Sequence, residues 1–422
     1  MKGHVKLELR NANGETKVVH QDNLITNAVL MNIANSVMLN TSGEASSIYD
    51  VFANLRNALG GILLFDDNLP EDKNNISFPT DCNLLGIGSN TNPSPYGNLA
   101  TFVSSESKYD KNGIKMVWDF NTSQGNGVIK SIALTNKEAY LNICDSYNDS
   151  YSGLTYISTA WPVLKSNDVG STIPFYFIDD SCYVWSAYDK CIYMINSNLD
   201  GSIKPYKRYN STLVKELNID NVLDITNGFD GYIYMLRNNP PSIKRYKLSD
   251  LSFDEDTNFQ MNINIENTLY YNSRYARIII CDGMAYIFYH SDCYYKINLE
   301  TMEQGKIQLP STINGISLIS ENHVYFLYYS DSSPYQVYKL DLKTGVILKT
   351  CILTPSKFEK AMCKRLNKSG LSLITYTRNG TTTLYVGMSK NYLGTICNLK
   401  TPIEKTADQT LRVTYTLTDV NT

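Results

Sequence analysis

Long hydrophobic runs are missing from this sequence. The longest uninterrupted apolar stretches, such as "ALGGILLF", span about eight residues, whereas a membrane-spanning helix needs roughly 20. The opening residues, "MKGHVKLELRN", enter an alternating strand pattern at once, without the apolar region and small-residue cleavage site of a secretory signal. We therefore expect a protein that is assembled in a cytoplasm and does not insert into a membrane.

An excess of either charge is also missing. The chain has 38 Lys and Arg residues against 41 Asp and Glu residues, which gives a net charge of -3 at pH 7. Proteins that bind nucleic acids or anionic membranes concentrate positive charge on one surface. The composition therefore predicts no nucleic-acid partner.

The nine cysteines include no CxxC motif. An odd number of cysteines without a secretion signal favours reduced, buried thiols over a disulfide framework or a metal site. Cys182 and Cys191 are spaced so that they could face each other across a hairpin, but a bridge there is not expected in a reducing compartment.

Histidine is scarce, with only His4, His20, His290 and His323 in the whole chain. We expect no close pair among them, and therefore neither a zinc site nor a His-based triad. The motifs GxSxG, GxxxxGK[ST], GxGxxG and the calcium loop D-x-[DN]-x-[DN]-G are missing. The glycines of "GIGSNTNPSPYGN" are interpreted as part of an exposed loop. The sequence thus predicts no catalytic residues, no metal and no cofactor.

Tyrosine, in contrast, is abundant: 32 Tyr against 13 Phe and 3 Trp. Its apolar ring and polar hydroxyl suit both half-buried strands and binding surfaces. An AT-rich genome would produce the same bias, so the composition alone does not choose between a structural and a functional role.

The first part of the chain reads as a mainly β domain. Val5, Leu7 and Leu9 alternate with charged residues, and Asn13-Gly14 supplies a tight hairpin turn. Apolar residues at helical spacing then predict two helices between about 25 and 60. Strand patterns return in "ILLFDD", "KMVWDF" and "GVIKSIALTN". We assign 1–165 to a β-rich, sandwich-like domain that carries two helices.

The middle of the chain repeats. A tyrosine-centred strand recurs around Tyr193, Tyr246, Tyr295, Tyr338 and Tyr385, at intervals of 53, 49, 43 and 47 residues, and an apolar strand precedes each one. Short strands repeated every 40 to 50 residues are the signature of a β-propeller. We therefore assign 166–396 to a propeller of about five blades; an ordinary β-sandwich is the alternative.

The last strand differs from those of the repeat. Leu411, Val413, Tyr415 and Leu417 alternate with polar residues, as in the opening hairpin, whereas the blade strands are apolar on both faces. We expect 397–422 to return to the N-terminal domain and complete its sheet, so that the propeller is an insertion.

Four stretches near the two ends of the chain carry a resemblance: "GETKVVHQDNLITNAV", "GGILLFDDNL", "KMVWDFNTSQGNGVIKSIALTN" and "NLKTPIEKTADQTLRVTYTL". They resemble tail-associated structural proteins of tailed bacteriophages and prophages of Gram-positive, low-GC bacteria, including tail-fibre, baseplate and receptor-binding proteins. The resemblance implies a virion tail component with an attachment domain, other tail proteins as partners, and a homo-oligomer such as a trimer. It implies no functional residue, because the shared stretches are structural.

Aromatic residues beside the blade turns are the candidates for ligand contact, because sugar rings stack on such side chains. These candidates for glycan contact are Trp185, Tyr188, Tyr289, Tyr294, Tyr328 and Tyr329. A role in the propeller core is the structural alternative for each of them.

Three functions remain open at this point. The first is a tail fibre or receptor-binding protein that contacts a host surface polysaccharide or wall polymer; the second is a purely architectural tail, baseplate or collar protein. A glycan depolymerase is the third. It would need paired carboxylates, but candidates such as Asp230 and Asp282 fall at turns, where Asp is common, and the S-x-D-x-G-x-T-W box of sialidases is missing. We therefore expect no enzyme.

Overall fold

A computed structural model provides the structure of the chain. It describes residues 2–29, 55–56, 58–91, 99–110, 113–137, 154–160, 174–179, 181–186, 190–195, 208–209, 212–261, 276–288, 293–310, 313–320, 322–328, 335–354, 364–366, 371–378, 381–389 and 392–418. Within these ranges the chain is built mainly from β-strands, which form two units. No helix in the described ranges is long and apolar enough to cross a membrane.

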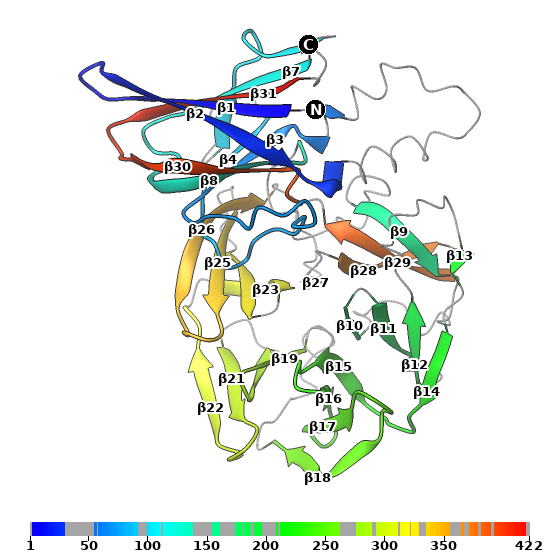
Figure 1. Cartoon of the computed structure of the whole chain (residues 1–422). Coiled ribbons are helices and arrows are strands. Elements are labelled where there is room, and N and C mark those ends of the chain that lie inside the picture. The colour runs from blue at the N-terminus through cyan, green and yellow to red at the C-terminus, as the bar shows by residue number, and fades with distance from the viewer. Residues whose placement is uncertain are drawn as a thin grey trace.

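The first unit is a closed barrel (Figure 1). Its strands are β1 (Lys2–Arg10), β2 (Thr16–Ile25), β3 (Gly61–Phe65), β4 (Leu84–Ser89), β5 (Leu99–Phe102), β7 (Gly113–Phe120), β8 (Gly127–Thr135), β30 (Thr395–Lys405) and β31 (Thr410–Thr418), with β6 (Lys108–Asp110) added beside β7. The order is β31-β1-β2-β30-β8-β3-β4-β5-β7, and β31 pairs with β7 to close the ring. The predicted sandwich is therefore wrong in this respect: pairing of the two edge strands removes the open edges that a sandwich keeps.

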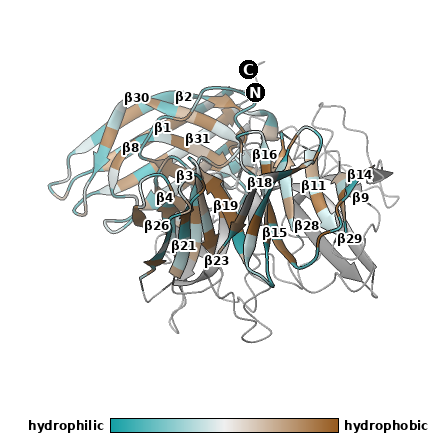
Figure 2. Cartoon of the chain, turned by 90° about the horizontal axis from the view of Figure 1, so that it is seen from below, coloured by the Kyte–Doolittle hydropathy of each residue, from teal (hydrophilic) through white to brown (hydrophobic). Residues whose placement is uncertain are grey.

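Alternation along the strands fills the barrel. The odd-numbered residues Val5, Leu7 and Leu9 of β1 are buried, and Leu7 lies opposite Val413 of β31 in the antiparallel register. Hydrophobic and hydrophilic bands consequently alternate along β1 and β31 (Figure 2). The prediction that the closing strand returns to the N-terminal domain is confirmed, because β31 pairs with β1 and its apolar face belongs to the barrel core.

The stretch "GIGSNTNPSPYGN", predicted to be an exposed loop, begins as a barrel strand. Gly86 and Gly88 lie in β4. A Cβ atom at Gly86 would approach Phe120 to 2.9 Å, and one at Gly88 would approach Trp118 to 2.9 Å. The glycines therefore allow two large aromatic rings to fill the barrel beside the backbone.

The two predicted helices fall mostly outside the described residues. Helical turns are described at 27–29 and at 55–58 without 57. Leu55 and Leu59 from the second turn are buried in the barrel core.

The second unit is a propeller-like ring of five small sheets (Figure 1). Three of the sheets have four strands each. The first holds β10 (Phe175–Ile178), β11 (Ser181–Ser186), β12 (Cys191–Ile195) and β14 (Thr212–Glu216); the second holds β15 (Val222–Asn227), β16 (Tyr232–Arg237), β17 (Ser242–Lys247) and β18 (Phe253–Gln260); the third holds β19 (Arg277–Cys281), β20 (Met284–Phe288), β21 (Cys293–Asn298) and β22 (Gln304–Gln308). The fourth sheet holds β23 (Ile313–Ser320), β24 (His323–Tyr328), β25 (Tyr335–Asp341), β26 (Ile347–Thr354) and β27 (Lys364–Leu366).

The fifth sheet joins distant parts of the chain. It contains β28 (Leu371–Arg378), β29 (Thr381–Ser389), β9 (Leu154–Ala160) and β13 (Arg208–Tyr209), in the order β13-β9-β29-β28. The predicted domain boundary at 165 is therefore wrong, since β9 pairs with β29 of the propeller. Alternation within a short strand cannot reveal a partner more than 200 residues away, so the sequence pattern assigned β9 to the preceding domain.

The predicted repeat is confirmed. Each tyrosine-centred strand pairs with the apolar strand before it, as β16 pairs with β17 and β24 with β25. The apolar strands are buried on both faces: in β20, Ala285 and Ile287 belong to one core cluster and Tyr286 and Phe288 to another, because neighbouring sheets pack on either side.

Six of the cysteines are described, and all six are free thiols. Cys182 lies opposite Ile195 and Cys191 lies opposite Ser186. The two cysteines therefore do not face each other across the hairpin, because each is displaced from the other in the strand register.

Barrel and propeller share a hydrophobic core. Phe65 and Leu84 of the barrel belong to the same buried cluster as Tyr325 of β24 and Val337 of β25. In Figure 1 the fourth sheet accordingly lies directly below β8 and β4. The fourth sheet thus fixes the propeller against the barrel.

Candidate functional site

Two of the six aromatic candidates for glycan contact have described side chains, and both are buried. Trp185 is 2 % exposed in the core beneath the first sheet, and Tyr294 is 5 % exposed and stacks on Phe288 with a centroid distance of 5.1 Å. A buried ring cannot stack on a sugar, so these two predictions are corrected in favour of a role in the core. Tyr188, Tyr289 and Tyr329 lie outside the described residues; Tyr328 ends β24, and its side chain also lies outside the described part.

Sequence reasoning missed an exposed aromatic residue. Phe229 is 68 % exposed in the turn between β15 and β16, where its φ of 59° is unusual for a large side chain. Its backbone N–H donates to Oδ1 of Asn227 at 2.9 Å, which holds the turn. The Asn-Gly-Phe-Asp-Gly stretch signals a turn, but nothing in it signals that the ring points outward.

A polar pocket lies where the fourth sheet meets the barrel. We call it the junction pocket; its volume is about 250 Å³. It is lined by Asp81, Asn83, His323, Lys339, Asp341, Thr344, Val346 and Leu348. The first two residues come from the chain segment before β4, and the others come from β24, β25 and β26 and the turn between the last two.

Strand alternation places these side chains on one face of the sheet. His323 lies opposite Asp341, and Lys339 lies opposite both Tyr325 and Leu348. Because residues two apart in a strand share a face, Lys339 and Asp341 point the same way. Val324 and Leu340 point to the opposite face and enter the core between the third and fourth sheets.

His323 is the most unusual group in the junction pocket. The residue is 6 % exposed, and its Nδ1 has no hydrogen-bond partner; Oδ1 of Asp81 lies 3.7 Å from it. Burial, reinforced by the positive charge of Lys339, lowers the pKa of His323. The imidazole is therefore neutral at pH 7, and Nδ1 is a buried polar atom that a ligand would satisfy.

Lys339 ties the two units together. It is 6 % exposed, and its Nζ donates hydrogen bonds to the carbonyl oxygens of Thr80 and, at 3.5 Å, Cys82. Burial lowers the pKa of Lys339, and the nearby carboxylate of Asp81 opposes this change. The ammonium group thus anchors the segment that carries Asp81 to the fourth sheet.

Asp341 and Asp81 supply the carboxylate hydrogen-bond acceptors of the junction pocket. Burial raises the pKa of Asp341, but hydrogen bonds from Thr344 and from the Lys343 and Thr344 amides outweigh it, so that the pKa is lowered overall. Asp341 is therefore ionised at neutral pH. The side chain of Asp81 is 92 % exposed and stands at the mouth of the pocket.

Two exposed apolar side chains complete the wall. Val346 is 48 % exposed and Leu348 is 45 % exposed. Carboxylate, amide, hydroxyl and imidazole groups beside an aliphatic surface suit a small ligand with hydroxyl groups on one side and C–H groups on the other. The volume of about 250 Å³ lies below the roughly 300–1,000 Å³ found for ligand pockets, which favours one ring over a long segment.

Metal-binding geometry is limited in the described residues. No group of three or more His, Cys, Asp and Glu side chains gathers there in a way that could hold an ion. The prediction that no two histidines form a close pair is nevertheless wrong, because His4 Nε2 lies 3.1 Å from His20 Nδ1. The two rings come from neighbouring strands, and their proximity depends on the register of the β1–β2 pair, which the separation in sequence conceals.

No protein-family model matches this chain, and no curated protein matches it in sequence. Solved structures with a similar arrangement include glutaminyl cyclase of Myxococcus xanthus, at 9% identity with a TM-score of 0.32 over 58% of this chain and 100% of that one. The N-terminal domain of Nup159 matches at 11% identity with a TM-score of 0.31, over 56% of this chain and 64% of that one.

A variant of KlHsv2 with loop 6CD replaced by a Gly-Ser linker matches at 8% identity with a TM-score of 0.28, over 48% of this chain. The chain spans 59% of the length of that protein. Similarities at this level carry no conclusion about function.

Proposed function

We propose that this chain is a tail-associated structural protein of a tailed bacteriophage, in which the barrel attaches to the particle and the propeller contacts a host surface glycan through the junction pocket. The proposal combines the resemblance of the terminal stretches with the chemistry of the pocket. Other tail proteins are the expected partners of the barrel, and assembly as a homo-oligomer such as a trimer follows from the same resemblance.

The connectivity is the observation that carries the proposal. Strands β1 and β31, from the two ends of the chain, pair side by side along nine residues from Lys2 opposite Thr418 to Arg10 opposite Thr410. The propeller is thus tethered at both ends to the barrel (Figure 1). Such an arrangement suits a constant attachment domain that presents an exchangeable binding module.

The pocket supports a glycan as the ligand. Asp81, Asn83 and Thr344 offer exposed polar groups for sugar hydroxyls, and Leu348 offers an aliphatic surface for the C–H face of a ring. One small pocket gives weak binding by itself. Several copies on a particle raise the overall affinity by about 10² to 10⁴.

Binding without cleavage fits the electrostatics better than hydrolysis does. A glycosidase needs one carboxylic acid whose pKa is raised so that it can donate a proton to the leaving group. The pKa of Asp341 is instead lowered by hydrogen bonds from its own turn. Asp341 is therefore suited to accept hydrogen bonds, and a depolymerase remains only the alternative that an assay must exclude.

The test is binding of the purified protein to cell walls of susceptible bacteria. Asp81→Ala and Leu348→Ser are expected to weaken binding, while Val128→Ser is the matched control because Val128 is an apolar barrel residue with similar exposure, 42 % against 45 %. Release of reducing ends would identify a depolymerase. Labelling the protein in intact particles should place it in the tail.

Failure of the unchanged protein to bind any susceptible wall, with the label found away from the tail tip, would favour the architectural function. Equal binding by the Leu348→Ser and Val128→Ser variants would show that the junction pocket is not the contact. A label found outside the tail would contradict the proposed function as a whole.

A further inference from the structure

The outer face of the first hairpin carries a histidine pair. His4 of β1 lies opposite Asp22 of β2, and His20 of β2 lies opposite Lys6. The two imidazole rings are stacked with a centroid distance of 5.3 Å and an interplanar angle of 24°. His4 Nδ1 lies 3.0 Å from Oδ1 of Asp22, and His4 Nε2 lies 3.1 Å from Nδ1 of His20.

Hydrogen bonding determines which ring nitrogen of His4 is available. A carboxylate only accepts hydrogen bonds, so His4 Nδ1 carries the proton that it donates to Asp22. The neutral ring then has its lone pair on Nε2, which accepts a hydrogen bond from the Nδ1–H group of His20. In a chelate the proton of His20 moves to its Nε2, so that the lone pair of Nδ1 becomes available to the ion. A histidine that binds a metal through one ring nitrogen commonly donates the N–H of its other ring nitrogen to a carboxylate, which orients the ring.

The separation of the two facing nitrogens matches a chelate. Two nitrogens bound to Zn²⁺ at their usual distance are about 2.9 Å apart at a right angle and about 3.3 Å apart at the tetrahedral angle. The observed separation of 3.1 Å lies between these values. Rotation about the terminal ring torsion, which has a broad energy minimum, would turn both lone pairs toward one ion.

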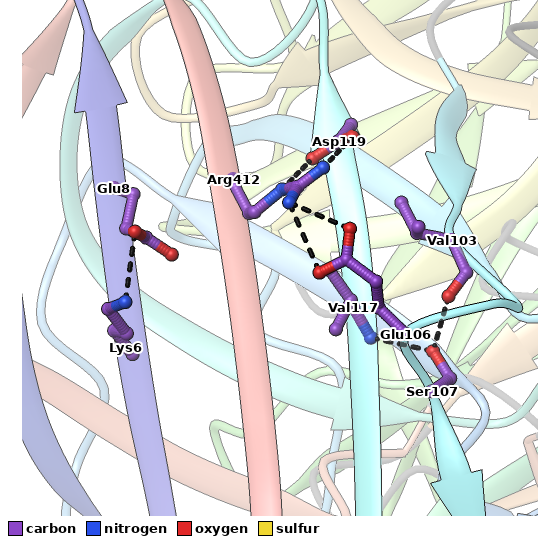
Figure 3. Close-up of polar contacts among 8 residues, drawn as sticks. All are labelled: Lys6, Glu8, Val103, Glu106, Ser107, Val117, Asp119 and Arg412. Carbon is purple, nitrogen blue, oxygen red and sulfur yellow. Dashed lines mark hydrogen bonds and ion pairs between the residues drawn. The ribbon is translucent and has the colours of Figure 1, made fainter. Parts of the chain in front are cut away.

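The surroundings leave the site open and do not repel a cation strongly. His20 is exposed, and the side chains of His4 and Asp22 are 45 % and 91 % exposed. Lys6, the nearest cation in the register, forms an ion pair with Glu8 at 2.9 Å (Figure 3). On the other side of His4, β31 contributes the uncharged Thr416.

We propose that His4 Nε2 and His20 Nδ1 form a two-histidine chelate for a divalent first-row transition metal ion such as Zn²⁺, with Asp22 as the residue that orients His4. Two protein ligands occupy two coordination positions, and water fills the others. Imidazole ligands select ions such as Zn²⁺, Ni²⁺ and Cu²⁺ over Ca²⁺ and Mg²⁺, which prefer oxygen. The chelate would link β1 to β2 on the outside of the barrel, independently of the junction pocket.

The experiment is a calorimetric titration of the full, untagged chain with ZnCl₂, with MgCl₂ as the control ion. One equivalent of Zn²⁺ should bind, and binding should disappear in His4→Gln and His20→Asn. Asp22→Asn should weaken it by about 10- to 100-fold, the usual effect of removing an outer partner. His323→Gln is the matched control, because it removes a buried histidine and should leave the affinity unchanged.

A second readout separates the chelate from general metal binding. Titration followed by NMR should shift the ring resonances of both His4 and His20 in the unchanged protein, and the one ring that remains in each single variant should not shift. Acidification should release the ion, because protons compete for the ring nitrogens. Absence of zinc binding, or equal affinity of the unchanged protein and His20→Asn, overturns the proposal.

Discussion

Arg412 of β31 binds Asp119 of β7 with two parallel hydrogen bonds, at 2.7 Å from Nε to Oδ1 and 2.8 Å from the second terminal nitrogen to Oδ2 (Figure 3). The same guanidinium donates to both oxygens of Glu106. Because β31 and β7 are the strands whose pairing closes the barrel, this contact lies on the outside of the closing seam. Hydrogen bonds to Asp119, assisted by its charge, raise the pKa of Arg412 above its ordinary value.

Replacing this arginine should therefore weaken the seam. The side chain is 36 % exposed, so solvent screening limits the effect, and we expect Arg412→Ala to lower the free energy of unfolding by about 1 kcal/mol. Arg412→Lys should lower the free energy of unfolding by less than Arg412→Ala does, but lysine cannot restore the full stability because it cannot form the two parallel hydrogen bonds. Urea denaturation measures both values, and Lys6→Ala, which removes a pair within one strand, is the control. Equal effects of Arg412→Ala and Lys6→Ala would contradict a special role for the seam.

The fifth sheet gives a prediction about the borders of the propeller. A fragment of residues 154–389 contains β9 together with β28 and β29, whereas a fragment of residues 168–389 lacks β9. Since β9 pairs with β29 over most of its length, the longer fragment should melt at a higher temperature and resist protease for longer. Circular dichroism and limited proteolysis provide the comparison. Identical behaviour of the two fragments would mean that β9 does not stabilise the propeller.

The buried aromatic residues should respond to substitution through stability and not through ligand binding. Trp185→Ala should cost about 3–5 kcal/mol of unfolding free energy, the usual effect of truncating a buried aromatic ring. Tyr294→Phe keeps the ring that stacks on Phe288, and it should leave binding to cell walls unchanged. Thermal denaturation and the wall-binding assay test the pair. A specific loss of binding in Tyr294→Phe, with the melting temperature preserved, would restore Tyr294 as a contact residue.

The buried histidine of the junction pocket predicts how stability depends on pH. Burial lowers the pKa of His323 in the folded protein, so the unfolded chain binds the additional proton more readily. Its contribution to stability is therefore complete above the unfolded pKa of about 6.5 and is lost as the pH falls from there toward the lower folded value. Each pKa unit by which the folded value lies below the unfolded value corresponds to about 1.4 kcal/mol of unfolding free energy that is lost at acidic pH.

Melting temperatures between pH 5 and pH 7.5 test this dependence. His323→Gln should flatten the decrease on the acidic side, whereas Asn83→Ala, which changes the same pocket without removing a titrating group, should keep it. An unchanged slope in His323→Gln would show that this imidazole does not control the acid sensitivity.

Local patterns predicted much of the architecture. Alternation at Val5, Leu7 and Leu9 and at Leu411, Val413 and Leu417 indicated two strands with one apolar face each, and the structure pairs them. The regular tyrosine spacing likewise indicated the propeller-like ring. These features depend on which neighbours in the chain are apolar, so they can be read without knowing the partner strand.

The site illustrates what local patterns miss. Lys247, Lys296 and Lys339 follow tyrosine at the same place in three successive repeats. Lys247 is exposed and Lys296 is half-buried, but Lys339 is 6 % exposed because the segment around Thr80 and Cys82 covers it. The repeat therefore gave no sign that one lysine and the adjacent His323 would form a pocket.

By itself, the sequence determined that this chain is mainly β, that a repeated unit lies within a different domain, and that both chain ends belong to that domain, because side-chain alternation and periodicity are local properties. Only the tertiary structure decided that the domain is a closed barrel, that β9 completes the fifth sheet, and that His4 meets His20 while His323 faces Asp81. Each of these features joins residues that lie far apart in the chain or on separate strands. Their proximity follows from register and packing, which no single segment encodes.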